Sequence, residues 1–149
     1  MTPHALTHRL ALTGDIPTLK SLMAESIREL LKDFLPLPAI EASFEVMGLD
    51  TRLIDDGTYF VVECDGAIAG CGGWSRRNTL FGGDQMKAGP DPLLDPAREP
   101  ARIRAFFVRP AYARRGVGSR SATQTKQPGL SRWSLIRSTG RSTRRVPSR

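Results

Sequence analysis

The stretch "VRPAYARRGVGS", residues 108–119, places three arginines and two glycines directly after a strand-like run, "RIRAFF". Gly116 and Gly118 stand where a helix should begin. A strand that turns through glycines into a helix exposes unpaired backbone N–H groups at the positive end of the helix dipole. Glycines let an anion approach these donors, and Arg114 and Arg115 add charge that can hold phosphate. The pattern predicts a phosphate-binding loop, with a solvated basic turn as the alternative.

The two cysteines are not expected to form a disulfide. If Asp65 and Gly66 make a hairpin turn, Cys71 faces Phe60 and lies roughly 13 Å along the strands from Cys64. A disulfide needs Cα atoms within about 7 Å. No metal site is predicted either, because the sequence offers no second Cys or His pair at ligand spacing.

Helical spacing dominates the first third of the chain. A short alternating run predicts a strand, and a helix should follow over 15–33, with Asp15 as its cap and Pro17 in its first turn. A second helix is expected over 38–48, closed by Gly48, and a short third one over 49–55. The apolar residues that define the first helix are Leu19, Leu22, Met23, Ile27, Leu30 and Leu31.

The middle of the chain predicts a β-hairpin. Strands over 58–64 and 67–76 meet at Asp-Gly, a dipeptide that tolerates the positive φ of a tight turn. Gly70, Gly72 and Gly73 in the second strand indicate either a bulge or the close approach of a ligand or another backbone.

A long loop and a further strand follow the hairpin. Residues 82–100 hold four prolines and three glycines, which predicts a lid, a binding loop or a disordered segment. The run "ARIRAFFVRP" predicts a strand that ends at Pro110. Strand alternation puts Ile103, Ala105 and Phe107 on one face and Arg104, Phe106 and Val108 on the other.

The formal charge of +7 is concentrated at the C-terminus. Residues 120–149 hold eight of the 22 basic residues and no acidic one, which leaves 14 basic against 15 acidic residues in 1–119. The charge is therefore no sign that the main part of the chain binds nucleic acid. No run of about 18 apolar residues could cross a membrane, and the N-terminus lacks the layout of a secretion signal. We expect a cytoplasmic protein without a membrane partner.

The loop 108–119 resembles the acetyl-CoA loop of the GNAT N-acetyltransferase family. In that family a strand is followed by Val-x-Pro and then by Gln/Arg-x-x-Gly-x-Gly/Ala. The order of the expected elements from about residue 7 onwards is similar as well. The chain departs from the pattern at Ala113, where the family has Gln or Arg. A dinucleotide-binding GxGxxG would need a third glycine, which is missing here.

The resemblance implies a fold of the α/β (α+β) class, with a mixed, mostly antiparallel sheet flanked by helices. It also implies acetyl-CoA as co-substrate and attack of a substrate amine on its thioester. The backbone of Phe106, Phe107 and Val108 would pair with the pantetheine amides. The pyrophosphate would lie on Arg114, Arg115, Gly116, Val117, Gly118 and Ser119.

The acceptor implied by the resemblance is an amine on a small molecule or a peptide. Trp74 and Arg76 end the hairpin where family members shape the acceptor site, although core packing and solvation are the alternative roles. No catalytic residue is assigned. Glu63 is a carboxylate near a strand end, more typical of a solvated charge, and Tyr112 lies inside the binding loop.

The tail after Ser119 departs from the family, whose chains continue with further helices and strands. Residues 120–149 contain ten Ser or Thr and little periodicity. We predict a GNAT-like domain over 1–119, incomplete at its C-terminus, and a basic tail over 120–149. A disordered segment and a shift of the gene's reading frame near residue 120 are two hypotheses for the tail.

Two classes of function follow. The first is an N-acetyltransferase that the tail impairs. The second is a binding module, either an acyl-CoA sensor without catalysis or a nucleic-acid binder acting through the basic tail. An open sheet edge would also allow a homodimer.

Overall fold

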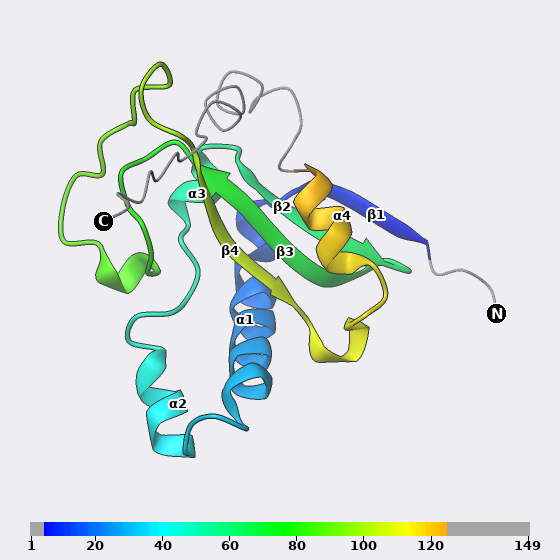
Figure 1. Cartoon of the computed structure of the whole chain (residues 1–149). Coiled ribbons are helices and arrows are strands. Elements are labelled where there is room, and N and C mark those ends of the chain that lie inside the picture. The colour runs from blue at the N-terminus through cyan, green and yellow to red at the C-terminus, as the bar shows by residue number, and fades with distance from the viewer. Residues whose placement is uncertain (1–4, 125–149) are drawn as a thin grey trace, which may run out of the picture.

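A computed structural model of the chain describes residues 5–124. Its centre is an antiparallel four-stranded sheet in the order β1-β2-β3-β4, so each strand pairs with its neighbours in sequence (Figure 1). The strands are β1 (Leu6–Leu10), β2 (Tyr59–Cys64), β3 (Ala67–Ser75) and β4 (Arg102–Val108). The predicted class, a mainly antiparallel sheet flanked by helices, is confirmed.

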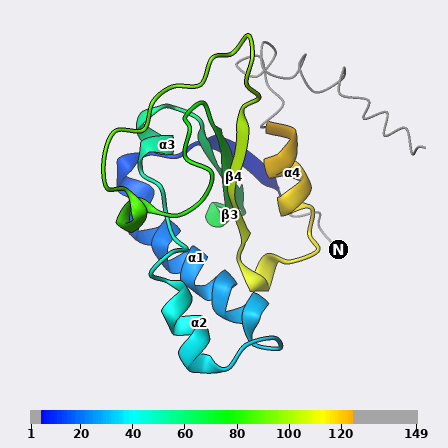
Figure 2. The ribbon, with the colours of Figure 1, turned by 60° about the vertical axis from the view of Figure 1, so that its left-hand side comes forward.

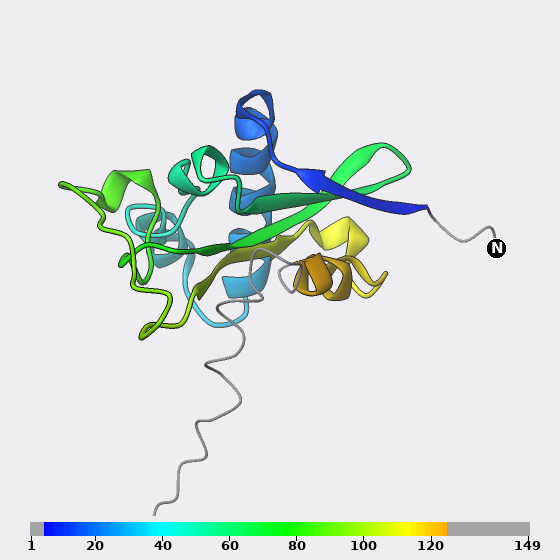
Figure 3. The ribbon, with the colours of Figure 1, turned by 90° about the horizontal axis from the view of Figure 1, so that it is seen from above.

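Helices cover both faces of this sheet. α1 and α4 lie on opposite sides of it, as the views in Figure 2 and Figure 3 show. No helix within residues 5–124 has the length and apolar content to cross a membrane. The helices are α1 (Ile16–Leu31), α2 (Leu37–Ser43), α3 (Arg52–Asp55) and α4 (Val117–Gln124), with 3-10 turns η1 (Thr13–Asp15), η2 (Asp84–Met86) and η3 (Pro110–Tyr112).

α1 forms largely as its apolar spacing predicts. Pro17 lies in the first turn, and the side of the helix that faces the sheet is buried, whereas Leu30 is 64% exposed. Asp15 occupies the cap position but does not cap α1 with its side chain. Its carboxylate instead accepts bonds from the Leu12 backbone N–H and from Arg9, because the 3-10 turn η1 turns it back toward β1.

The second helix is shorter than predicted. α2 ends at Ser43, whose hydroxyl donates to the Ile40 carbonyl at 2.6 Å. Turns continue the chain to residue 46, and Gly48 does not adopt the positive φ of a helix-ending glycine. The prediction of a helix to residue 48 is therefore wrong, whereas the third helix is confirmed as α3.

The predicted hairpin is confirmed, with Asp65 and Gly66 at φ values of 50° and 84°. A register shift next to Val62 leaves Ala69 without a partner on β2. Cys71 therefore pairs with Val61 and not with Phe60, since a bulge moves every later residue by one position. Both cysteines are free and buried.

A second bulge interrupts β4. Cys71 pairs with Phe107 and Gly73 with Arg104, so Gly72 lies opposite two residues, Ala105 and Phe106. Ala105 has a φ of 51°.

Because of this bulge, the prediction of which residues lie on each face of β4 is wrong. Because strand alternation is broken at Ala105, Arg104 shares the α1 side of the sheet with Ala105 and Phe107, and Ile103 faces the α4 side. Local sequence alternation cannot reveal such a break.

The three glycines of β3 serve close packing. A Cβ at Gly70 would collide with Val117 of α4. A Cβ at Gly72 would lie 2.8 Å from the Phe106 ring, and one at Gly73 would meet Thr58 and Tyr59. Both predicted explanations, a bulge and a close approach, therefore apply to this strand, and the approaching groups within residues 5–124 are side chains and backbone.

The long loop between β3 and β4 packs on the domain. Asp56 accepts two bonds of 2.7 Å from Arg77, and the backbone of Arg77 bridges to Leu93. Buried Asp50 forms ion pairs with Lys87 of the loop and with Arg104 of β4. The Arg104 guanidinium also donates to the loop carbonyls of Thr79 and Gly82 at 2.9 and 2.8 Å.

Gly70→Ala should lower the free energy of unfolding by about 1–3 kcal/mol, because the added methyl collides with Val117. In a Val117→Ala background the same change should cost much less, which a double-mutant cycle of denaturant unfolding measures. Additive losses would show that α4 does not pack on Gly70.

Asp56→Asn should destabilise the protein by about 1–3 kcal/mol at neutral pH, because it removes the charged partner of Arg77. The bond from Arg77 holds the pKa of Asp56 below its ordinary value. Its stabilisation is therefore complete above the ordinary Asp pKa of about 3.9 and is lost as the pH falls through the lowered value. Urea unfolding at neutral and acidic pH measures this difference. Exposed Asp55→Asn is the matched control, and an equal loss in both variants would contradict the prediction.

Candidate functional site

The outer edge of β4 is open within residues 5–124, since β3 pairs with its other side. The N–H of Arg109 donates to the Ala69 carbonyl of β3 at 2.8 Å. Backbone groups alternate in direction along a regular strand, so the N–H group of the preceding residue, Val108, faces the open edge. This edge offers main-chain hydrogen-bonding groups to an extended ligand.

Two side chains fix the backbone at this edge. The Tyr59 hydroxyl donates to the Ala105 carbonyl at 2.7 Å and holds the bulge. The Ser26 hydroxyl of α1 donates to the Val108 carbonyl at 2.7 Å. Of the predicted pantetheine-pairing residues, Val108 therefore has its carbonyl already occupied and offers its N–H.

The predicted phosphate loop follows directly. Arg109 lies 3.6 Å from Glu25 of α1, and η3 then turns the chain. Arg114 and Gly116 have φ values of 61° and 82°. Arg115 lies over the Tyr112 ring at 5.7 Å. Within residues 5–124 neither Arg114 nor Arg115 forms an ion pair with a carboxylate, so both charges are available to an anion.

α4 begins at Val117, as the glycine pattern predicts. The N–H of Arg120 closes the first helical bond to the Gly116 carbonyl at 3.0 Å, which leaves the N–H groups of Val117 and Gly118 without a partner inside the helix. The Val117 side chain is buried against β3, and a Cβ at Gly118 would meet nothing closer than Val108 at 3.8 Å. The Val117 side chain anchors α4 on the sheet, and the first turn of the helix stays accessible.

Within the described residues α4 (Val117–Gln124) runs past residue 119, after which the predicted tail begins. The rest of the predicted tail lies outside the described residues.

A cavity of about 330 Å³ opens beside the N-terminal half of β4. The segment between α2 and α3, the start of the long loop and β4 form its walls. Most of its side chains are apolar, and no carboxylate lines it. Its apolar side chains are Val46, Met47, Leu80, Phe81, Ile103 and Phe107, with Ala105 among the β4 residues.

The residues predicted to contact the acceptor do not line this cavity. Trp74 pairs with Ile103 across β3 and β4, and Arg76 lies 3.7 Å from Asp56. Glu63 on β2 is bound to Arg9 at 3.0 Å, with β3 between its strand and β4. Sequence reasoning missed the cavity residues, although the apolar pair Leu80-Phe81 within a loop was a signal for an exposed apolar site.

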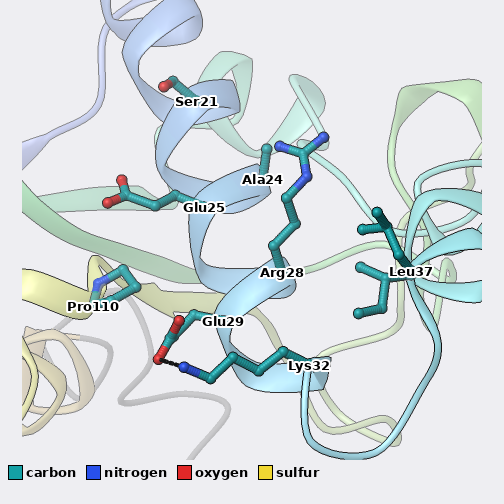
Figure 4. Close-up of a pocket in the computed structure, with 9 residues that line it drawn as sticks. Ser21, Ala24, Glu25, Arg28, Glu29, Lys32, Leu37 and Pro110 are labelled. Atoms are coloured by element: carbon teal, nitrogen blue, oxygen red, sulfur yellow. Dashed lines mark hydrogen bonds and ion pairs between the residues drawn. The ribbon is translucent and has the colours of Figure 1, made fainter.

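A second groove, of about 800 Å³, runs between α1, α2 and Pro110 (Figure 4). Its charged side chains form ion pairs with one another or with neighbours outside the groove. Lys32 binds Glu29 at 2.6 Å, and Arg28 binds Glu41 at 2.7 Å. Since these charges are already compensated, the groove is a weaker candidate for an anion than the loop before α4.

Neither buried thiol is a candidate nucleophile at the open edge. Burial raises the pKa of the Cys71 thiol to about 11, so this group is protonated at neutral pH. Cys64 lies on β2, away from β4.

Solved structures share this fold. The PaiA N-acetyltransferase of Thermoplasma acidophilum, solved with coenzyme A, superposes with a TM-score of 0.55 at 10% identity, over 80% of this chain and 69% of that one. A GNAT family acetyltransferase of Brucella melitensis, solved with acetyl-CoA, gives 0.50 at 17% identity, over 92% and 71%. At these identities the likeness concerns the fold alone.

Comparison at the level of sequence identifies the family. No curated protein matches the chain. Residues 24–133, however, match the acetyltransferase (GNAT) family, and this range contains the β4 edge, the glycine loop and α4. Because the match spans most of the chain, the protein belongs to the GNAT acetyltransferase family.

Proposed function

We propose that this protein is an N-acetyltransferase that moves the acetyl group of acetyl-CoA to an amine. One observation carries the proposal: the open edge of β4 leads directly into a loop whose two arginines have no carboxylate partner within residues 5–124, and then into the accessible N-terminus of α4. An extended arm with main-chain-like amides fits the edge, and a pyrophosphate fits the loop and the helix end.

The cofactor residues predicted from the sequence form one continuous track in this proposal. The backbone of this part of β4 would pair with the pantetheine arm, chiefly through the N–H of Val108. The N–H groups of Val117 and Gly118, supported by Arg114 and Arg115, would bind the pyrophosphate. Phe107 contributes its side chain to the core and to the cavity wall. The role of Trp74 and Arg76 at the acceptor stays a prediction.

The reaction would be direct transfer. The amine nitrogen attacks the thioester carbon, the new C–N bond forms, the C–S bond breaks, and the proton lost by the amine ends on the thiolate. Holding both reactants beside β4 supplies proximity, and an edge N–H can stabilise the oxyanion. Within residues 5–124 no carboxylate lines the cavity, so the amine would enter neutral or lose its proton to solvent.

Nucleic-acid binding was the alternative, and it depends on residues 120–149. Most of these lie outside the described residues, and the family match favours acetyl transfer.

Gly118→Glu should weaken acetyl-CoA binding by at least about tenfold, because it places a negative side chain where the helix donors would meet the pyrophosphate. Gly118→Ala is the matched control and should bind like the parent, since its Cβ would meet only Val108 at 3.8 Å. Isothermal titration calorimetry measures both affinities. Unchanged affinity in the Glu variant would remove the loop from the site.

We expect slow turnover, because residues 120–149 contain no acidic residue and no tyrosine that could protonate the leaving thiolate. A chain whose codons after residue 119 are read in the shifted frame should show both faster thiol release from acetyl-CoA and a higher melting temperature. Equal turnover and equal melting temperature would show that residues 120–149 complete the domain and would refute the frameshift hypothesis.

A further inference from the structure

The cavity beside β4 lies at the end of the path that the cofactor arm would follow along the open edge. The phosphate loop follows the C-terminal end of β4, so an arm that starts there and runs along the open edge points toward the N-terminal half of the strand. From Val108 to Ala105 this path is about 10 Å. The cavity is lined by Ile103, Arg104 and Ala105 of that half, and by Phe107 farther along β4.

The walls of this cavity are apolar and open to solvent. Val46, Leu80, Phe81 and Ile103 are between 39% and 65% exposed. Large apolar side chains that gather at one exposed place indicate a binding surface, whereas isolated ones need no explanation. Arg104 holds the loop that carries Leu80 and Phe81. Its guanidinium donates to the carbonyl before this pair and to the carbonyl after it.

The electrostatics of the cavity argue against a polycationic acceptor. Its one charged lining residue, Arg104, is positive and is paired with buried Asp50 outside the cavity. Lys87 pairs with the same carboxylate. Within residues 5–124, the cavity therefore presents no carboxylate that could bind a second ammonium group of a polyamine or an amino sugar.

We infer that this cavity binds the acceptor, and that the acceptor is a primary amine with an apolar aliphatic or aromatic body. This inference rests on the proposed acetyl transfer. The apolar body would lie between Phe81 and Ile103, and the amine nitrogen would point to the edge at Ala105. Nitrogen attack on the thioester yields an N-alkyl acetamide and the free thiol of the cofactor.

The test uses the full chain with coenzyme A, which cannot transfer an acetyl group, and two probes, 4-phenylbutylamine and spermidine. Calorimetry should show tighter binding of 4-phenylbutylamine. Phe81→Ala should weaken that binding about tenfold, because a large part of the aromatic contact is lost. Phe34→Ala is the matched control, since Phe34 is 78% exposed and lies outside the cavity. It should leave the affinity unchanged.

A second variant tests the charge argument by gain of binding. Ile103→Glu puts a carboxylate into the cavity at a side chain that is 57% exposed, so folding should not suffer. Spermidine affinity should rise about tenfold in this variant. The melting temperature of each variant confirms that it is folded.

The outcomes separate this inference from the proposed function. Tighter binding of spermidine to the parent chain, or equal 4-phenylbutylamine affinity in the parent and in Phe81→Ala, overturns the inference while coenzyme A still binds. If the parent chain does not bind coenzyme A, the proposed acetyl transfer is overturned. Binding of 4-phenylbutylamine that responds to Phe81→Ala and not to Phe34→Ala supports the inference.

Discussion

The bulge at Ala105 is the constraint on which the candidate site depends. A left-handed φ at a residue with a Cβ costs about 1–2 kcal/mol, and the buried Tyr59 hydroxyl offsets part of this cost through its bond to the Ala105 carbonyl. The extra residue turns Arg104 inward to Asp50 and leaves Ile103 on the other face. In a regular strand Ile103 would lie on the same side as Phe107, and Arg104 would lie on the opposite side, away from Asp50.

The bulge in turn requires glycine on the neighbouring strand. Tyr59 reaches Ala105 from β2, two strands away, and its ring crosses Gly73, where any Cβ would collide with Thr58 and Tyr59. Gly72 accommodates the Phe106 ring that the bulge tilts over it, and Gly70 accommodates Val117. The "GCGG" run of β3 thus determines both the shape of the β4 edge and the place where α4 rests.

Local patterns predicted what depends on local chemistry. The Asp-Gly turn, the apolar side of α1 and the start of α4 at the glycines follow from backbone preferences of a few residues, and each is confirmed. The faces of β4 and the partner of Cys71 depend on bulges set by contacts between distant strands, so alternation alone gave the wrong answer for both. The cavity joins residues 46–48, 80–82 and 103–107, which only the folded loop brings together.

The same strand therefore presents two chemically different ends. At its C-terminal end, Arg114, Arg115 and the first turn of α4 supply positive charge and N–H donors that suit an anion. At its N-terminal end, Arg104 is buried in an ion pair with Asp50, and most of the exposed cavity side chains are apolar. A long cofactor with a charged and a neutral end can bind along such a strand in only one direction, because reversal would place phosphates against Phe81 and Ile103. In the proposed reaction, the charge distribution along β4 would therefore set the orientation of the reacting group.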